Sequence, residues 1–114
     1  MNKPPKISIA ELYNIKKKKE NKNSMVFNHI LDNCNKKIKH IAEHGGLNLY
    51  YKIPPIIIGF PLYNHITCIE YIINELKLSG LYVIQLPNPN NNYIYISWKV
   101  DDLSQKVKSR LLLE

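Results

Sequence analysis

Arginine is almost absent from this chain of 114 residues: of its sixteen basic side chains, only Arg110 is an arginine and the others are lysines. The planar guanidinium group of arginine clamps phosphates and reads guanine edges, whereas the lysine ammonium is a compact, strongly hydrated point charge. If the partner is a nucleic acid, this composition favours contacts with the backbone over base reading. An AT-rich genome would also produce the preference for lysine, because isoleucine, lysine and asparagine are all abundant here.

Cysteine is also scarce, with only Cys34 and Cys68. Two cysteines do not make the disulfide framework of a small secreted protein. Cys34 lies within an apolar helical stripe and Cys68 beside another, where a free cysteine behaves as a small buried hydrophobic residue. His65 precedes Cys68 by three residues, but a nucleophilic cysteine also needs an exposed, electropositive site. We therefore expect two reduced, unreactive thiols.

Metal-binding and catalytic motifs are missing as well. His40 and His44 have the spacing of two metal ligands on one helix face, yet zinc needs a third and usually a fourth ligand. The sequence contains no CxxC pair, no glycine-rich phosphate loop, no GxSxG motif and no paired carboxylates. We expect no metal, no cofactor and no enzymatic activity, and we expect both histidines to face solvent near the end of a helix.

Long apolar runs are lacking too. The longest, Ile56–Phe60, is far shorter than the ~20 residues that span a bilayer. The first residues, Met-Asn-Lys-Pro-Pro-Lys, have no apolar stretch of the kind found in a signal peptide. The sequence therefore predicts an intracellular protein without a membrane span. Its length fits a single domain, and 45% hydrophobic residues suffice for one core.

What the sequence has in excess is positive charge, and this excess is confined to the first half. Residues 1–52 contain eleven lysines and four acidic residues, whereas acidic and basic residues are equal in number from 53 to 114. A one-sided positive field favours anionic partners. The competing interpretation is a basic helix end that keeps the protein soluble and suits the helix dipole. The candidate nucleic-acid site consists of seven lysines: Lys16, Lys17, Lys18, Lys19, Lys22, Lys36 and Lys37.

Two helices are predicted in this basic half. Ser8 and Glu11 have the spacing of a capping box and begin a short helix over residues 8–20. Asn21–Ser24 is expected to be a break, with Ser24 as the next N-cap. Apolar residues then recur at spacings of three and four, which predicts a helix over residues 25–44 that ends at two glycines.

The second half is predicted to contain strands between two further helices. Asn64 is a candidate N-cap for a helix that ends at Ser79, and Asp101 or Asp102 for a last helix. The segment Ile56–Phe60 is expected to be a short strand or a buried extended segment. Strand composition or period-two alternation marks three other segments: residues 47–53, 81–86 and 93–98.

These elements predict an α+β fold: a small three-stranded, mainly antiparallel sheet backed by two main helices, with short N- and C-terminal helices. The expected organisation is a basic extension (1–24), an α+β core domain (25–100) and a helical tail (101–114). The order partly resembles the winged-helix class, but residues 54–64 lack the periodicity of the second helix which that class requires between its first two strands. The predicted core is Ile30, Leu31, Ile38, Ile69, Ile72, Ile73, Ile94, Ile96 and Trp98.

Tyrosines are the most informative polar set. In the last predicted strand, Tyr93 and Tyr95 lie opposite the isoleucines, and Tyr50 or Tyr51 is expected to join them from a neighbouring strand. Aromatic rings on a sheet surface stack single-stranded bases when lysines lie beside them. Two other interpretations remain open: the tail or the N-terminal segment covers the tyrosines, or they form a flat protein–protein interface. The candidate interaction face is Tyr50, Tyr93 and Tyr95.

Four short segments of the sequence carry a resemblance to a known family: Tyr51-Lys52-Ile53-Pro54-Pro55, Gly59-Phe60-Pro61-Leu62-Tyr63, Cys68-Ile69-Glu70-Tyr71-Ile72 and Ile94-Tyr95-Ile96-Ser97-Trp98. They resemble a family of small uncharacterised proteins of nucleocytoplasmic large DNA viruses. The resemblance covers roughly residues 25–98, and an AT-rich composition fits such genomes. It implies an infected host cell or a virion as the setting, and it implies no activity or functional residues.

Together these features predict a non-enzymatic interaction protein, a viral structural or accessory component that docks on other proteins. The alternative is a nucleic-acid-binding protein that uses the lysine-rich surface and the tyrosine-bearing sheet. Salt distinguishes the two, because counterion release makes nucleic-acid affinity fall steeply with salt concentration.

Overall fold

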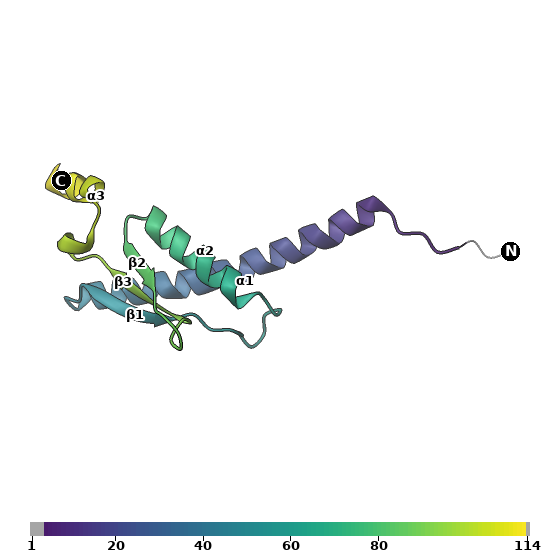
Figure 1. Ribbon diagram of the computed structural model, residues 1–114, viewed down its shortest axis with the longest axis horizontal. Coiled ribbons are helices and arrows are strands. Elements are labelled where there is room, and N and C mark those ends of the chain that lie inside the picture. Colours follow the sequence, from purple (N-terminus) through teal and green to yellow (C-terminus); the bar gives the residue numbers. More distant parts are fainter. Residues whose placement is uncertain (1–3, 114) are drawn as a thin grey trace.

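The computed structural model of the chain describes residues 4–113, with the side chains of Leu112 and Leu113 left aside. The fold consists of two long helices, a three-stranded sheet and a short helical tail (Figure 1). In chain order the elements are α1 (Ile9–Glu43), β1 (Asn48–Lys52), α2 (His65–Leu78), β2 (Tyr82–Gln85), β3 (Tyr93–Ser97), a 3-10 turn (Val100–Asp102) and α3 (Gln105–Leu113).

The sheet is antiparallel throughout, with β3 in the centre and the order β1-β3-β2. Tyr95 of β3 is paired with Tyr50 of β1 on one side and with Ile84 of β2 on the other. Both long helices pack on the same face of the sheet, because each contributes residues to one core with the strands. The predicted α+β class and the three-stranded antiparallel sheet are confirmed.

The core lies between this sheet face and the two helices. Five residues of the predicted core are buried, namely Ile30, Ile69, Ile72, Ile94 and Ile96. The other four, Leu31, Ile38, Ile73 and Trp98, are partly buried and pack against the core. The period of 3.6 on the helices and of two on β3 thus identified the buried faces correctly.

The first helix is longer than predicted, since the expected break at Asn21–Ser24 lies within a continuous helix of 35 residues. None of these four residues is glycine or proline, so each costs the helix only a few tenths of a kcal/mol. The packed part of α1 already supplies a nucleus, and each further turn then adds hydrogen bonds without another nucleation step. The prediction of two helices was wrong, whereas both ends were correct: Ser8 caps the Glu11 N–H, and Gly45 follows with φ of 84°.

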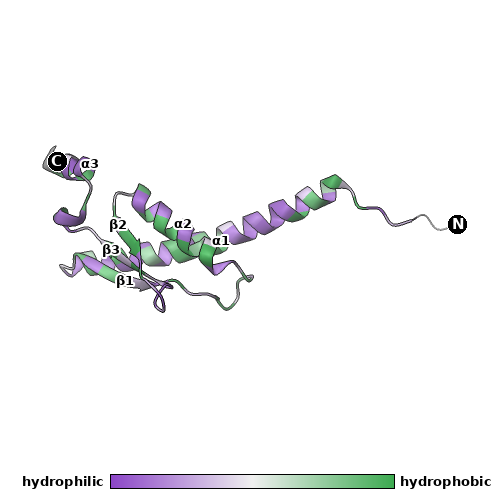
Figure 2. Ribbon diagram, in the orientation of Figure 1, coloured by the Kyte–Doolittle hydropathy of each residue, from purple (hydrophilic) through white to green (hydrophobic). Residues whose placement is uncertain are grey.

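Residues 9–24 of α1 form an arm that projects from the rest of the molecule (Figure 1). The first buried residue of the helix is Val26. The longest dimension is 76 Å against 31 and 26 Å for the others, and the radius of gyration is 19.4 Å. A compact chain of this length would have a radius of gyration of about 13 Å. Figure 2 shows that the arm is hydrophilic along most of its length and hydrophobic near its tip.

The connection between β1 and α2 is an irregular loop, so the prediction of a strand at Ile56–Phe60 was wrong. The alternative of a buried segment holds only for Ile57 and Phe60, which are partly buried against the core. Pro54 and Pro55 begin it, and Gly59 adopts φ of 91°, which turns the chain before a strand can form. Ile58 is 98% exposed. The second helix of a winged-helix domain is therefore missing, as expected. Asn64 caps α2 by accepting a hydrogen bond from the Thr67 N–H.

The tail differs from its prediction in how it begins. Asp102 does not cap a helix; its carboxylate accepts a hydrogen bond from the Ser97 hydroxyl at 2.6 Å. Ser104 caps α3 instead, since its hydroxyl lies 3.4 Å from the Val107 nitrogen. The two adjacent aspartates end a 3-10 turn, and that turn holds Asp102 over the end of β3. Sequence spacing alone does not distinguish these two uses of an aspartate.

Candidate interaction face

The face of the sheet opposite the helices carries a group of aromatic and aliphatic side chains. Because strand residues alternate between the two faces, the core positions Leu49, Val83, Ile94 and Ile96 place their neighbours on the opposite side. The ladder registers bring these neighbours together, with Tyr95 between Tyr50 and Ile84. We call this surface the tyrosine face; its members are Tyr50, Tyr82, Ile84, Tyr93 and Tyr95.

Three tyrosine rings form the centre of the tyrosine face, one from each strand. The ring of Tyr95 lies 5.2 Å from that of Tyr50 and 6.3 Å from that of Tyr82, centroid to centroid. The Tyr95 hydroxyl accepts a hydrogen bond from the side chain of Asn48 at 3.2 Å. Tyr50 is 61% exposed and Tyr82 39% exposed. Tyr95 is thus held in place from three sides, while its two neighbours project into solvent.

One end of the face is hollowed. Tyr50 and Tyr93 line a hollow of about 290 Å³ together with Leu86 and Asn90 from the β2–β3 turn. This hollow is open and shallow compared with the pockets that enclose small ligands. It is therefore a shallow depression that can accept an apolar side chain of another protein.

The three tyrosines predicted for this face all lie on it, and the structure adds two members. Of Tyr50 and Tyr51, the two predicted alternatives, Tyr50 lies on this face. Tyr51 packs against the core on the other face, where burial raises its pKa. Tyr82 and Ile84 were not predicted. The alternation of Tyr82, Val83 and Ile84 was a usable signal, but the face of β2 depends on its register with β3.

Of the residues that the structure describes, neither the tail nor the N-terminal segment covers the three predicted tyrosines, so that interpretation was wrong. After the 3-10 turn the chain runs to the other side of β2, where α3 lies beside the end of α2 (Figure 1). There the side chain of Val107 lies over Gly80, between α2 and β2, close enough that an added methyl group at Gly80 would contact it. The tail reaches only the edge of the tyrosine face, where Tyr82 lines a hollow with Ser104, while Tyr50 and Ile84 stay exposed.

Charges at the ends of the tyrosine face balance one another. Lys52 is paired with Tyr93 in the ladder at one end. At the other end Lys99, Asp101 and Asp102 follow β3 directly. A surface that tracks a nucleic-acid backbone carries a positive groove beside its aromatic rings. The excess charge of this chain lies elsewhere.

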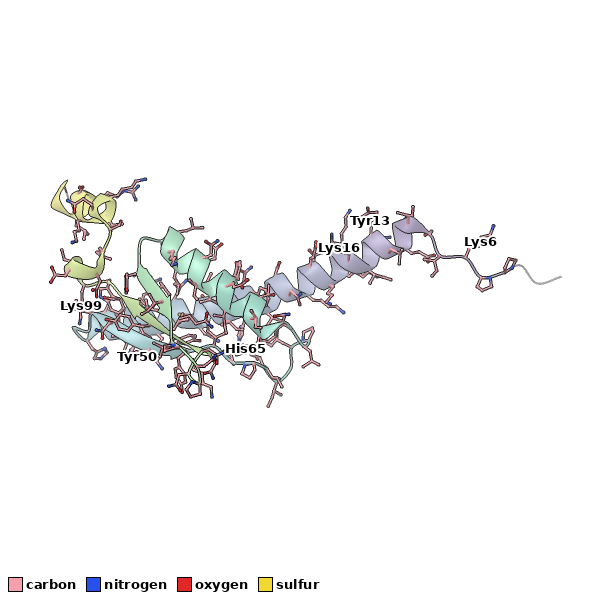
Figure 3. The ribbon with its side chains drawn as sticks, viewed as in Figure 1. Lys6, Tyr13, Lys16, Tyr50, His65 and Lys99 are labelled. Atoms are coloured by element: carbon pink, nitrogen blue, oxygen red, sulfur yellow. The ribbon has the colours of Figure 1, made fainter. Side chains whose placement is uncertain are left out.

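The seven predicted lysines do not form one site. Five of them, from Lys16 to Lys22, are on the arm, and Figure 3 shows Lys16 far from the sheet and from Tyr50. The other two follow about 21 Å further along the helix at 1.5 Å per residue. Lys36 pairs with Asp32 at 2.9 Å, which also lowers the pKa of that carboxyl group.

The cysteines are part of the core. Both are free and fully buried. Burial raises the pKa of Cys34 to about 12 and that of Cys68 to about 11. The ring of His65 donates a hydrogen bond from Nε2 to the Ile53 carbonyl at 2.7 Å, so it holds the end of β1. Neither thiol has the depressed pKa of a nucleophile.

The histidine pair at the end of α1 is explained by the helix terminus. The His44 ring donates from Nδ1 to the carbonyl oxygen of His40 at 2.8 Å, which satisfies one of the last helical carbonyls. Within residues 4–113, no three side chains of His, Cys, Asp or Glu lie close enough to hold a metal ion.

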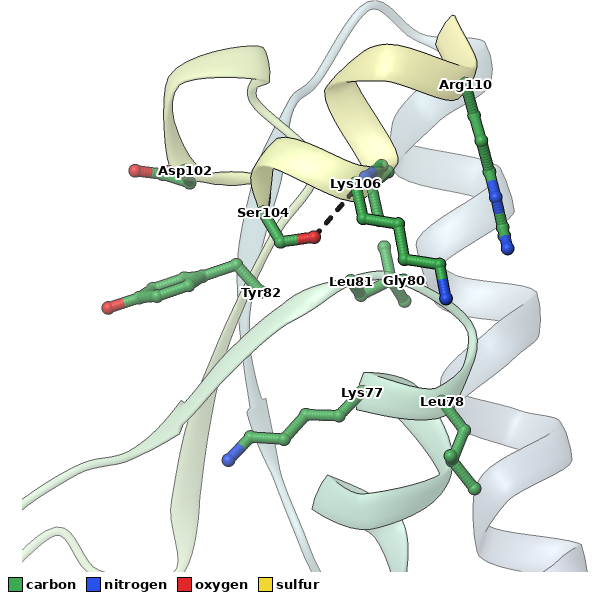
Figure 4. Close-up of a pocket in the computed structure, with 10 residues that line it drawn as sticks. Lys77, Leu78, Gly80, Leu81, Tyr82, Asp102, Ser104, Lys106 and Arg110 are labelled. Atoms are coloured by element: carbon green, nitrogen blue, oxygen red, sulfur yellow. Dashed lines mark hydrogen bonds between the residues drawn. The ribbon is translucent and has the colours of Figure 1, made fainter.

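A second hollow, of about 490 Å³, lies between α3 and the end of α2. Lys106 and Arg110 extend from α3 toward the last turn of α2, which itself carries Lys77 (Figure 4). The C-terminus of a helix has a partial negative charge and attracts cations. The dipole of α2 therefore explains why basic side chains line this hollow, and no bound anion is needed to explain them.

The fold and the exposed face define a two-layer α+β protein that covers one side of its sheet with helices and leaves the other side open. The chain belongs to a family of unknown function, DUF5759, whose model matches residues 7–77. That match contains α1, β1 and all of α2 except Leu78. No curated protein and no solved structure matches the chain. In the described residues, no helix is both long and apolar enough to cross a membrane.

Proposed function

We propose that this protein is a non-enzymatic interaction protein that docks on another protein through the tyrosine face. The observation that carries the proposal is the open sheet surface, on which Tyr50, Tyr82 and Ile84 surround the fixed ring of Tyr95 and stay exposed. Contiguous apolar patches on soluble proteins mark sites where other molecules bind.

Tyrosine suits such a site for two physical reasons. Its ring buries a large apolar area with few rotatable bonds, and its hydroxyl finds a hydrogen-bond partner at the rim. Here the central ring is preorganised by Asn48 and by its two aromatic neighbours, so little ordering entropy is lost on binding. The expected partner surface is flat and apolar, with acceptors for the tyrosyl hydroxyl groups.

The balance of charge favours a protein over single-stranded nucleic acid at this face. Stacked bases require cations along the path of their phosphates, whereas Lys52 is offset by the aspartates at the far end of the strands. An exposed apolar loop supports the same proposal, since Ile56, Ile58 and Leu62 are also solvent-exposed.

The test is capture of partners from the native source with the purified full chain, in the presence of nuclease. Tyr50→Ala should abolish specific capture, and Tyr13→Ala is the matched control, because Tyr13 is similarly exposed but lies on the arm. Reconstitution of the complex from the two purified proteins should survive a rise in salt from about 50 to about 200 mM, whereas a nucleic-acid contact would weaken steeply. Equal capture by both variants would refute the proposal.

The setting of this function is a separate proposal. The sequence resemblance supports a role as a structural or accessory component of a large DNA virus. Mass spectrometry of purified particles and of infected cells tests it, and a chain found in neither sample would contradict it.

A further inference from the structure

The arm of α1 is a helix that the described part of the chain leaves unsupported. Every side chain from Ile9 to Lys22 is exposed, and the first buried residue is Val26. The arm meets the globular part only at its base, where Lys19 and the half-buried Asn23 line a hollow with residues 62–67. At 1.5 Å per residue the arm is about 24 Å long, and Figure 3 shows Tyr13 and Lys16 well away from the globular part. Helices in proteins derive most of their stability from packing against another element. The arm therefore presents a helix without its usual source of stability.

The charge of the arm opposes its own helix. One ion pair offsets part of the repulsion: the Lys16 Nζ lies 4.0 Å from the Glu20 carboxylate, but both side chains are well exposed, so the pair contributes little. Lys18 and Lys22 are one turn apart, and like charges at that spacing destabilise a helix. A ligand with closely spaced negative charges would remove this repulsion and stabilise the helical arm.

The lysines surround the helix instead of lining one side. Successive residues of an α-helix are turned by about 100°, so Lys16–Lys19 point in four directions around the axis. A flat anionic surface would neutralise only the lysines that face it. A groove with phosphates on both walls would neutralise the lysines on two sides of the helix. Lys19 lines a hollow with Tyr63 and Thr67 at the start of α2, so it is the one of the four that faces the globular part.

The apolar residues of the arm do not form a continuous stripe. Membrane-surface helices and partner helices need one apolar face along their whole length. On the arm three polar residues interrupt such a face, and the hydrophobic residues lie toward the tip (Figure 2). The positions that continue the core stripe backwards from Phe27 at spacings of three and four are Asn23, Glu20, Lys16, Tyr13 and Ile9.

We propose that the arm binds duplex DNA, with the helix in the major groove and its lysines on the phosphates of both walls. The major groove of B-DNA admits an α-helix, whereas that of an RNA duplex is too deep and narrow. The arm contains no arginine, so its contacts fix position without reading sequence. This site is distinct from the tyrosine face, and its partner is of a different class.

The test is a titration of the full chain with a fluorescent DNA duplex over a range of salt concentrations. Replacing Lys16, Lys17, Lys18 and Lys19 with glutamine should lower the log–log salt slope by about 2 to 3, because up to three of them reach phosphates and each lost phosphate contact removes about 0.9. The matched control replaces Lys36, Lys37, Lys39 and Lys106, which are exposed lysines on the globular part and the tail. It removes the same charge and should change the slope by less than one contact.

A second pair of variants tests the helical arm itself. Asn21→Pro keeps every lysine but breaks the helix, and it should weaken duplex binding at least tenfold relative to Asn21→Ala. Equal binding by the two would overturn the placement in a groove, as would equal affinity for a single strand of the same length.

Titrations with two other anionic ligands test whether the arm prefers duplex DNA. Vesicles rich in phosphatidylserine and an acidic polypeptide, titrated alongside the duplex, should bind more weakly at equal salt. Tighter binding of either, or no duplex binding at low salt, would overturn the proposal. Tyr50→Ala should leave duplex binding unchanged, so a failure here is distinguishable from a failure of protein docking.

Discussion

Tyr95 and Tyr50 face one another across the β1–β3 ladder, with ring centroids 5.2 Å apart and planes inclined at 49°. The two residues have different environments. Tyr95 sits on the central strand and its hydroxyl is bonded to Asn48, while Tyr50 is on the edge strand and 61% exposed. Tyr95 therefore supports the structure of the tyrosine face, whereas Tyr50 is free to contact a partner.

Tyr95→Ala should therefore reduce stability, and Tyr50→Ala should not. Loss of two ring contacts and one hydrogen bond predicts a decrease of about 1–3 kcal/mol in the free energy of unfolding for Tyr95→Ala. Tyr50→Ala should stay within about 0.5 kcal/mol of the native protein. Urea denaturation measures both, and similar losses for the two variants would mean that Tyr50 also belongs to the scaffold.

Ile72→Ala should be among the most destabilising substitutions in α2. Its side chain is fully buried between the sheet and the helices, and truncation leaves a cavity that costs about 2–5 kcal/mol. Ile66→Ala is the matched control on the same helix, because Ile66 is 69% exposed, and it should cost less than about 0.5 kcal/mol. A small loss for Ile72→Ala would indicate a loosely packed core.

Stability should fall at alkaline pH through the buried thiols. Burial raises the pKa of Cys34 from its ordinary 9.0 to about 12. The thiol is protonated in both states below pH 9; between about 9 and 12 the unfolded chain loses the proton while the folded chain keeps it. The free energy of unfolding therefore decreases as pH rises through this window. Cys34→Ala should show a shallower decrease than the native protein in denaturation curves measured at several alkaline pH values.

Ser97→Ala should loosen the junction between the sheet and the tail. Ser97 is fully buried; its hydroxyl donates to the Asp102 carboxylate and accepts from the Lys99 N–H at 3.2 Å. A hydrogen bond to a charged group contributes about 1.5–3 kcal/mol, so we expect a loss of that order in thermal or urea unfolding. Amide exchange in the 3-10 turn should accelerate in parallel, and unchanged exchange would show that the turn is held by other contacts.

Prediction from sequence worked where one face of an element is buried. The stripe through Phe27, Ile30 and Cys34 has a helical period because α1 lies on the sheet over that stretch. The alternation of Tyr93 to Ser97 likewise marked a strand with one covered side, and two members of the tyrosine face, Tyr93 and Tyr95, followed from it. Burial of one face imposes these periods on the apolar residues, so the periods can be recognised in the sequence.

Prediction failed where no buried face constrains the chain. On the arm, the polar residues at Asn21–Ser24 fit a helix or a break equally well, and continuity depends on the nucleus that the packed part of α1 provides. Tyr82 and Ile84 joined the tyrosine face only through the register of β2 with β3. The aspartate at 102 was expected as a cap, but folding brought it to Ser97.

The sequence by itself determined the α+β class, the buried faces of the helices and of the hairpin, the burial of both cysteines and the one-sided distribution of charge. These properties depend on local period and composition, which each segment carries within its own residues. The tertiary structure decided that the sheet keeps one face open, that the tail turns away from it and that the lysines project on an arm. Those outcomes depend on pairing between distant segments, whose registers and contacts no single segment encodes.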